Sequence, residues 1–271
     1  MTADPVAALA PDRDVVAGQA REAVARFAAL VRRIGPGDPP AVGDWSVRDV
    51  AVHVAWAMDR YTDFLGGTPS PATAVEQTAT FSAAAIAEAT DRTPEGLARA
   101  VDEAGERYFA AAARAEGPVT WHAGLSLSVP ALLGLTLGEA LVHGHDVAVA
   151  LGEPWELPRA WARTVFRAAL PALPLYVDAA ATAGVHARID VRLRGDPGAR
   201  VVFDVADGTL TVRPAPVADP VDCHLWADPA AFLLVFYGRT TPMRPALRGR
   251  ILAWGRRPWL GFALPGYLRR P

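Results

Sequence analysis

The spacing of apolar residues changes near Gly184, and this change constrains the possible fold more than any other feature of the sequence. Before it, apolar residues recur every three to four positions, which is the period of amphipathic helices. The predicted helices cover residues 14–34, 47–65, 71–90, 93–114 and 129–151. After it, apolar and polar residues alternate over short segments, as they do in half-buried strands. The sequence therefore predicts an α+β protein that is helical first and then built on a small sheet.

Glycines and prolines divide the chain into three predicted parts. Four of the predicted helices can form a four-helix bundle, which we expect over residues 1–155. Residues 156–183, which several prolines interrupt, are expected to be a linking helical segment. Residues 184–271 are expected to form a small α+β domain with an antiparallel sheet, because Asp207-Gly208 is typical of a hairpin turn. Its predicted strands cover residues 187–193, 201–205, 209–212, 221–226 and 250–254.

The composition is that of a globular protein, and it narrows the classes of partner. Hydrophobic residues make up 51% of the chain and charged residues 21%, which is enough apolar content to bury a core. A net charge of -2 gives no electrostatic reason to expect a nucleic acid or an anionic membrane as a partner. Cys223 is the only cysteine, so no internal disulfide can form, and a reducing, cytoplasmic location is expected.

The predicted helix at 129–151 carries a pair of polar residues in an otherwise apolar stretch. Glu139 and His143 are four positions apart, so on a helix they share one face, about 6 Å apart along the axis. A carboxylate and an imidazole placed in this way can hold a divalent metal, or they can form a buried hydrogen-bonded pair. His145 lies about 200° around the helix from His143 and is expected to point elsewhere.

A third metal ligand would have to come from another helix, and His53 is the candidate. Ser46 and Asp49 can form a capping box at the start of the helix that follows residue 46, and His53 falls on its apolar face. Two imidazoles and one carboxylate would leave one open position on a tetrahedral zinc ion, as in catalytic sites. The spacing alone does not choose between this metal site and a structural hydrogen bond.

Two motifs resemble those of a known family. Residues 45–53, with the sequence WSVRDVAVH, resemble the W-S/T-x-x-D-x-x-x-H signature of the metal-binding helix in DinB-like bundles. Residues 138–148, GEALVHGHDVA, are similar to the E-x-x-x-H-G-x-D-L/V-A segment of the mycothiol-dependent maleylpyruvate isomerase family. The C-terminal part resembles the second domain of that family, which is similar to sterol-carrier proteins. The resemblance covers nearly the whole chain.

The resemblance implies a fold, a metal site and a cofactor. The fold would be a DinB-like bundle followed by a sterol-carrier-like α+β domain. The metal triad would be His53, Glu139 and His143, binding zinc or another divalent metal, and the thiol cofactor would be mycothiol. Asp146 matches the family's aspartate and is expected to support a ligand histidine. His145 stands where the family usually has Trp or Phe, so the mouth of the pocket is expected to differ there.

Arg239 is the candidate residue for substrate binding. It matches the family's Gly-Arg step after a C-terminal helix, where a guanidinium can bind a carboxylate through two hydrogen bonds. The alternative is a solvated arginine near a helix C-terminus. Arg248 and Arg250 are weaker candidates because they belong to a generally basic segment. Cys223 is expected to be a packed residue and not a nucleophile. The remaining histidines are expected to be structural or exposed: His122, His186 and His224.

Together with the resemblance, these features predict a cytoplasmic, zinc-dependent enzyme that uses a small thiol on a small electrophilic substrate. The resemblance implies that this thiol is mycothiol. As an isomerase, it would let a metal-bound thiolate add to a cis double bond conjugated to a carbonyl, and elimination after rotation would restore a trans alkene. Within the same chemistry, the alternative is a mycothiol S-transferase, in which the adduct is the product. The alternative of another class is a non-catalytic protein that binds a small apolar molecule or a lipid. Neither a nucleic acid nor a membrane is an expected partner.

Overall fold

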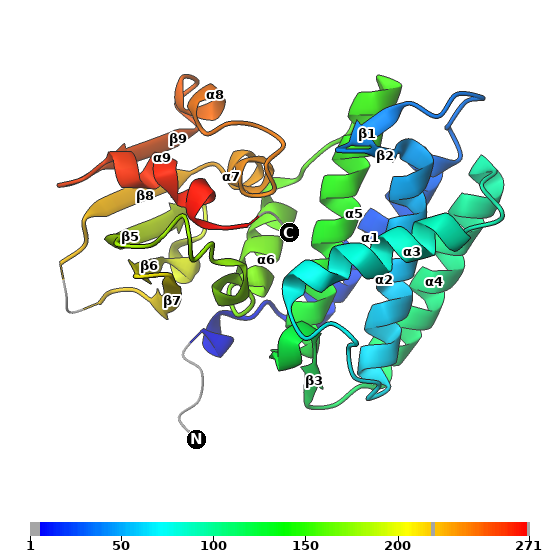
Figure 1. The fold of residues 1–271 in the computed structure, drawn as a ribbon, viewed down its shortest axis with the longest axis horizontal. Coiled ribbons are helices and arrows are strands. Elements are labelled where there is room, and N and C mark those ends of the chain that lie inside the picture. The colour runs from blue at the N-terminus through cyan, green and yellow to red at the C-terminus, as the bar shows by residue number, and fades with distance from the viewer. Residues whose placement is uncertain (1–5, 218–219, 270–271) are drawn as a thin grey trace. The chain divides into compact units, whose positions relative to one another are not determined.

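The computed structural model describes residues 6–217 and 220–269. This backbone divides into two compact units, one formed by residues 11–157 and the other by residues 6–10 together with 158–269. Figure 1 shows the first unit as a group of long helices and the second as a sheet with shorter helices. The α+β class predicted from the sequence is confirmed. The predicted domain limits stay a prediction, and residues 158–183 are part of the second compact unit.

Four long helices form the first unit, as predicted. They are α1 (Arg13–Val31), α2 (Val47–Leu65), α4 (Pro94–Arg114) and α5 (Val129–Leu151). Both α1 and α2 pack against α4 and α5, so the four helices enclose one core. The apolar face of each helix buries a large side chain almost completely: Phe27, Met58, Tyr108 and Leu137. Two short antiparallel pairs, β1 (Pro40–Val42) with β2 (Trp45–Ser46) and β3 (Pro118–Thr120) with β4 (Ser126–Ser128), precede α2 and α5.

The helix α3 (Thr78–Glu88) is shorter than the helix predicted at 71–90, and it packs on α2. A 3-10 turn, η2 (Val75–Gln77), comes before it. The side-chain oxygen of Gln77 accepts hydrogen bonds from the backbone N–H groups of Thr73 and Ala74, at 2.8 and 3.4 Å. Because a side chain satisfies these backbone donors locally, the chain does not need to begin a helix there.

The second unit is built on a five-stranded sheet with the order β7-β6-β5-β8-β9. Its strands are β5 (His186–Leu193), β6 (Val201–Ala206), β7 (Thr209–Pro214), β8 (Cys223–Ala227) and β9 (Ile251–Trp254). Asp207 and Gly208 both have positive φ angles, of 43° and 82°, and form the predicted hairpin turn between β6 and β7.

One strand pair differs from the predicted antiparallel sheet. β5 and β8 are parallel, whereas β5–β6, β6–β7 and β8–β9 are antiparallel. After β7 the chain returns to the other side of β5, and it then runs in the direction of β5. Apolar alternation is the same for both directions, so the sequence pattern of β8 does not reveal its orientation.

The helices of the second unit cover one face of this sheet. They are α6 (Arg159–Ala169), α7 (Pro229–Phe236), α8 (Met243–Ala246) and α9 (Trp259–Ala263). Phe166 of α6 and Phe232 of α7 meet edge to face, with ring centroids 5.5 Å apart, above the buried strand residues Ile189 and Phe203. Among the described helices, none combines the length and the apolar content that crossing a bilayer requires.

Candidate metal centre

His53 lies in the second turn of α2, and a capping box sets the start of this helix. The Ser46 side chain accepts a hydrogen bond from the Asp49 N–H, and the Asp49 carboxylate accepts one from the Ser46 N–H at 2.8 Å. The other oxygen of Asp49 binds the Arg92 guanidinium at 2.6 Å. Helix α2 therefore begins at one defined residue, which determines the face on which His53 lies.

Glu139 and His143 lie one turn apart on α5, as their spacing predicts. Between His143 and His145, Gly144 allows an unusually close contact. A Cβ atom at this position would lie 2.1 Å from the Trp155 ring, whose N–H donates a hydrogen bond to the Leu141 carbonyl at 3.0 Å. The glycine in the His-Gly step is therefore needed for the packing of Trp155 against the helix backbone.

The structure brings the three predicted ligands together. The Nε2 atoms of His53 and His143 each lie 3.3 Å from Oε2 of Glu139. One ligand atom from each residue falls within 4.8 Å of the others, and the two imidazole rings meet edge to face with centroids 4.9 Å apart. The side chains are 14%, 24% and 12% exposed for His53, Glu139 and His143, so the cluster is screened from water without being sealed.

Each imidazole also has a polar partner on its far side. His53 Nδ1 lies 2.6 Å from the Ser82 hydroxyl, and His143 Nδ1 lies 3.2 Å from Oδ2 of Asp146. Both Nε2 atoms face Glu139 and hydrogen-bond to its carboxylate. With an outer partner that accepts the Nδ1 proton, a metal that replaces the Nε2 proton would find the Nε2 lone pair available. Metal-binding histidines usually have this arrangement, with an outer acceptor that orients the ring. The residues present therefore fit a divalent metal.

The charges inside the cluster stabilise one another. Burial raises the pKa of Glu139, but hydrogen bonds with His143 and His53 outweigh it and hold that pKa well below its ordinary value. Burial lowers the pKa of His143, yet Asp146 and Glu139 together raise it above the ordinary value for histidine. Glu139 is thus an ionised carboxylate between two imidazoles, which is the form that binds metal.

Two indoles lie beside the histidines. The Trp45 ring centroid is 4.8 Å from that of His53 and 6.4 Å from that of His143. On the same helix as His53, Trp56 lies 6.0 Å from it, centroid to centroid. These rings restrict the rotamers of the imidazoles and form an apolar rim at the cluster.

Comparison with known proteins identifies the family of the chain. The family model of the mycothiol maleylpyruvate isomerase N-terminal domain matches residues 17–148, and that of the SCP-2 sterol transfer family matches residues 169–255. The chain belongs to the mycothiol-dependent maleylpyruvate isomerase family. Membership places it in a family of enzymes.

Solved structures of this family have the same fold. The crystal structure of the mycothiol-dependent maleylpyruvate isomerase matches over 90% of this chain and 93% of its own, with a TM-score of 0.55 and 14% identity. A mutant of that isomerase with one histidine replaced by alanine matches over the same shares, with a TM-score of 0.55 and 15% identity. Among curated proteins, none matches the chain.

The other predicted residues lie outside the cluster. Within the described residues His145 is not part of it. Arg239 follows α7 in the second unit, where its guanidinium donates to the Tyr237 carbonyl at 2.6 Å, and its role in binding substrate stays a prediction. Arg250 binds the buried Asp228 carboxylate at 2.6 Å, which is a structural role. Cys223 is buried, and burial raises the pKa of its thiol, as expected of a packed residue.

The remaining histidines have contacts of a structural kind. His122 is buried against Phe64 and shares a hydrogen bond with Ser70, and His224 binds the buried Asp190 at 2.6 Å. Burial lowers the pKa of His122 to about 4. His186 is exposed beside Asp207.

Sequence reasoning missed Ser82, the partner of His53. This serine lies on α3, a helix without a distinctive motif, and no local signal points to it. Its contact depends on how α3 packs against α2.

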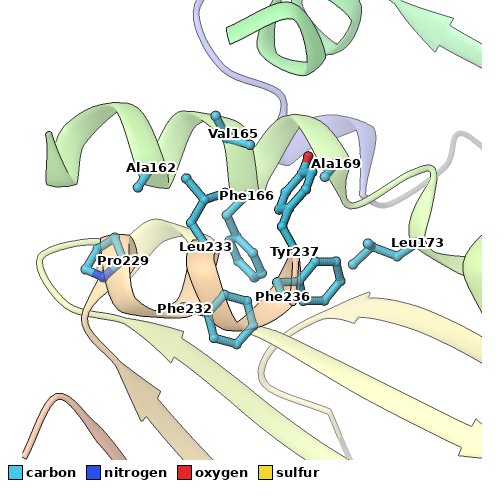
Figure 2. A pocket seen from close by; sticks show the side chains of 10 residues that line it. All are labelled: Ala162, Val165, Phe166, Ala169, Leu173, Pro229, Phe232, Leu233, Phe236 and Tyr237. Atoms are coloured by element: carbon cyan, nitrogen blue, oxygen red, sulfur yellow. The ribbon is translucent and has the colours of Figure 1, made fainter. Parts of the chain in front are cut away.

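The second unit contains an apolar pocket between α6 and α7. Figure 2 shows side chains of the two helices facing each other around it, among them Phe166, Phe232 and Phe236. Its volume is about 310 Å³ including the open mouth, and the hydroxyl of Tyr237 is the only polar side-chain group among its lining residues. If the protein were a non-catalytic binding protein, its small apolar ligand or lipid would be expected in this pocket. None of its lining residues is a metal ligand, so it is a feature separate from the histidine cluster.

Proposed function

We propose that this protein is a metal-dependent isomerase that uses mycothiol to convert maleylpyruvate, or a closely related cis-unsaturated keto acid, into its trans isomer. The observation that carries the proposal is the convergence of His53 Nε2, His143 Nε2 and Glu139 Oε2 within 4.8 Å, in a chain that belongs to the mycothiol-dependent isomerase family. The solved isomerase with the same fold supports the choice of substrate.

The chain's own residues would hold the metal and orient its ligands. His53, Glu139 and His143 supply two nitrogens and one carboxylate oxygen, a set that zinc accepts while keeping one position open. Ser82 and Asp146 hold the two rings so that their Nε2 atoms face the same point. When bound, a divalent metal would lower the pKa of a thiol at the open position and so raise the amount of thiolate at neutral pH.

Mycothiol would act as a nucleophile that adds to the cis double bond and later leaves, so that it is regenerated in each turnover. The rim formed by Trp45 and Trp56 would exclude water from the reacting atoms. Arg239 would bind a carboxylate of the substrate, since a guanidinium suits a carboxylate geometrically. A cytoplasmic location belongs to the same proposal, because the reaction requires a reduced thiol.

The test begins with metal analysis of the purified protein. We expect about one equivalent of divalent metal per chain, lost in His53→Ala and kept in His186→Ala, which removes an exposed histidine of the second unit. Metal content that is negligible, or equal in the two variants, would rule out the metal centre.

Activity is measured next, with maleylpyruvate and mycothiol. We expect isomerisation that requires both thiol and metal and that returns the thiol unchanged. Accumulation of a stable thiol conjugate would instead indicate a transferase. A metal-loaded protein that turns over none of a panel of electrophiles would contradict the enzymatic proposal.

A further inference from the structure

Helix α3 is held to the first unit more weakly than the long helices are. All eleven of its residues are described, and among them only Ser82 is buried, whereas six are exposed. In α4, by contrast, nine residues are buried. A helix of eleven residues is marginally stable by itself in water, so α3 depends on packing that is slight. Segments with few buried contacts open locally at a low cost in free energy.

The chain is held firmly on both sides of α3. Before the helix, Ala72 is buried, and its carbonyl accepts a hydrogen bond from the Ala123 N–H at 3.0 Å. After the helix, the Arg92 guanidinium binds the Asp49 carboxylate at 2.6 Å. Residues 76–91 therefore lie between two anchored points, so this segment can move without displacing the long helices.

The one buried residue of α3 contacts a predicted metal ligand. The Ser82 hydroxyl lies 2.6 Å from Nδ1 of His53. Figure 1 shows α3 crossing α2, the helix that carries His53, and the two helices pack on each other. Helix α3 thus covers the outer side of His53, and a hydrogen bond links this weakly packed helix to the candidate metal centre.

A metal on Nε2 of His53 would strengthen this hydrogen bond. It would leave the ring proton on Nδ1, where the Ser82 hydroxyl can accept it, and its positive charge would make the Nδ1–H group a better donor. Hydrogen bonds with a charged partner are about twice as strong as those between neutral groups. Metal binding would therefore favour the state in which α3 lies against His53, and by linkage this state would bind the metal more tightly.

We propose that α3 is a cover that opens and closes over the His53 side of the candidate metal centre, and that a bound metal closes it through Ser82. Opening would expose the outer side of His53 to solvent, and closing would shield it. This inference deepens the proposed function and rests on its metal centre.

The test is hydrogen–deuterium exchange of the full-length protein with and without zinc, followed by mass spectrometry of peptides from α3 and α4. Without zinc, we expect the amides of α3 to exchange faster than those in the interior of α4. Zinc should slow exchange in α3 about fivefold, as a stronger hydrogen bond at Ser82 requires. Metal analysis of the same samples shows whether zinc is bound.

Two variants on the same helix separate the role of Ser82 from a general stabilisation by metal. Ser82→Ala, loaded with saturating zinc, should lose the zinc-dependent slowing in α3. The matched control is Thr80→Ala, which removes an exposed hydroxyl and should keep the slowing. The cover is refuted if metal-free α3 exchanges as slowly as α4, if bound zinc leaves α3 unchanged, or if Ser82→Ala keeps the full effect. A protein that binds no zinc would refute the metal centre itself, and the closure with it.

Discussion

At the scale of single residues, the outer partners of the histidines decide how well the cluster holds a metal. Ser82 and Asp146 contact the Nδ1 atoms of His53 and His143 and so direct both Nε2 atoms toward Glu139. Asp146 is almost completely buried, which keeps its carboxylate in one position. Outer acceptors of this kind orient a ligand ring and raise its basicity.

We predict that Asp146→Asn lowers the affinity for zinc by roughly 10- to 100-fold, because an amide supports the Nδ1 proton less well than a carboxylate. Ser82→Ala should have an effect in the same direction through His53. Competition with a chelator of known affinity measures the change. Asp59→Asn, which alters an exposed aspartate paired with Arg107, is the control and should keep full affinity. Equal affinities in all variants would show that the outer partners do not tune the site.

At Gly144, the absence of a Cβ atom is required for the packing of the Trp155 ring. We predict that Gly144→Ala destabilises the protein by about 2 kcal/mol, because the new methyl group would overlap the Trp155 ring. The control is Gly18→Ala in α1, where a Cβ would meet nothing within 4 Å; it should stabilise by about 0.5–1 kcal/mol. Urea unfolding measures both. In a Trp155→Ala background the cost of Gly144→Ala should largely disappear, and persistence of the full cost would refute the steric explanation.

At the scale of elements, a buried carboxylate connects the strands of the second unit. Asp190 on β5 is fully buried and binds Arg192, Arg200 and His224, the last from the neighbouring strand β8. Burial raises the pKa of Asp190, but the hydrogen bonds from these three residues outweigh it and lower the pKa from 3.8 to about 2. The folded sheet therefore favours the ionised form.

This pKa predicts how the sheet responds to acid. A carboxylate with a lowered pKa in the folded state contributes stability above its unfolded pKa and loses it as the pH falls through the folded one. We expect a loss of about 2 kcal/mol between pH 4 and pH 2 from this residue. Unfolding free energies of the unmodified protein and Asp190→Asn, measured across this range, should converge as the pH falls. A constant difference between the two would contradict the prediction.

At the scale of the whole molecule, a bound metal would join two helices that are distant in sequence. His53 on α2 and Glu139 on α5 are 86 positions apart. A ligand that binds only the folded state stabilises it, by about 2.7 kcal/mol at a concentration one hundred times its Kd. The metal is therefore expected to contribute to the stability of the bundle as well as to chemistry.

We predict that removing the metal with a chelator lowers the Tm of the helical unit by roughly 5–10 °C. Calorimetry with and without added zinc measures the shift. In His53→Ala the shift should vanish, whereas His186→Ala should retain it. An unchanged Tm in the metal-loaded protein after chelation would show that the metal does not couple α2 to α5.

The sequence by itself determined the features that depend on near neighbours along the chain. Helical periodicity and side-chain capping determine the limits of α2, α4 and α5 and the capping box at Ser46. Helical periodicity also places Glu139 and His143 on one face of α5. The same holds for the Asp207-Gly208 hairpin, because a type of turn is encoded in its own residues.

Only the tertiary structure decided the features that depend on how elements pack. Three contacts join residues that are not near neighbours in the sequence. His53 approaches Glu139 and contacts Ser82 on α3, and Trp155 packs closely on Gly144. The parallel pairing of β5 with β8 is another such feature. Periodicity tells which face of an element is buried and does not tell which neighbour buries it, since apolar contacts are not directional.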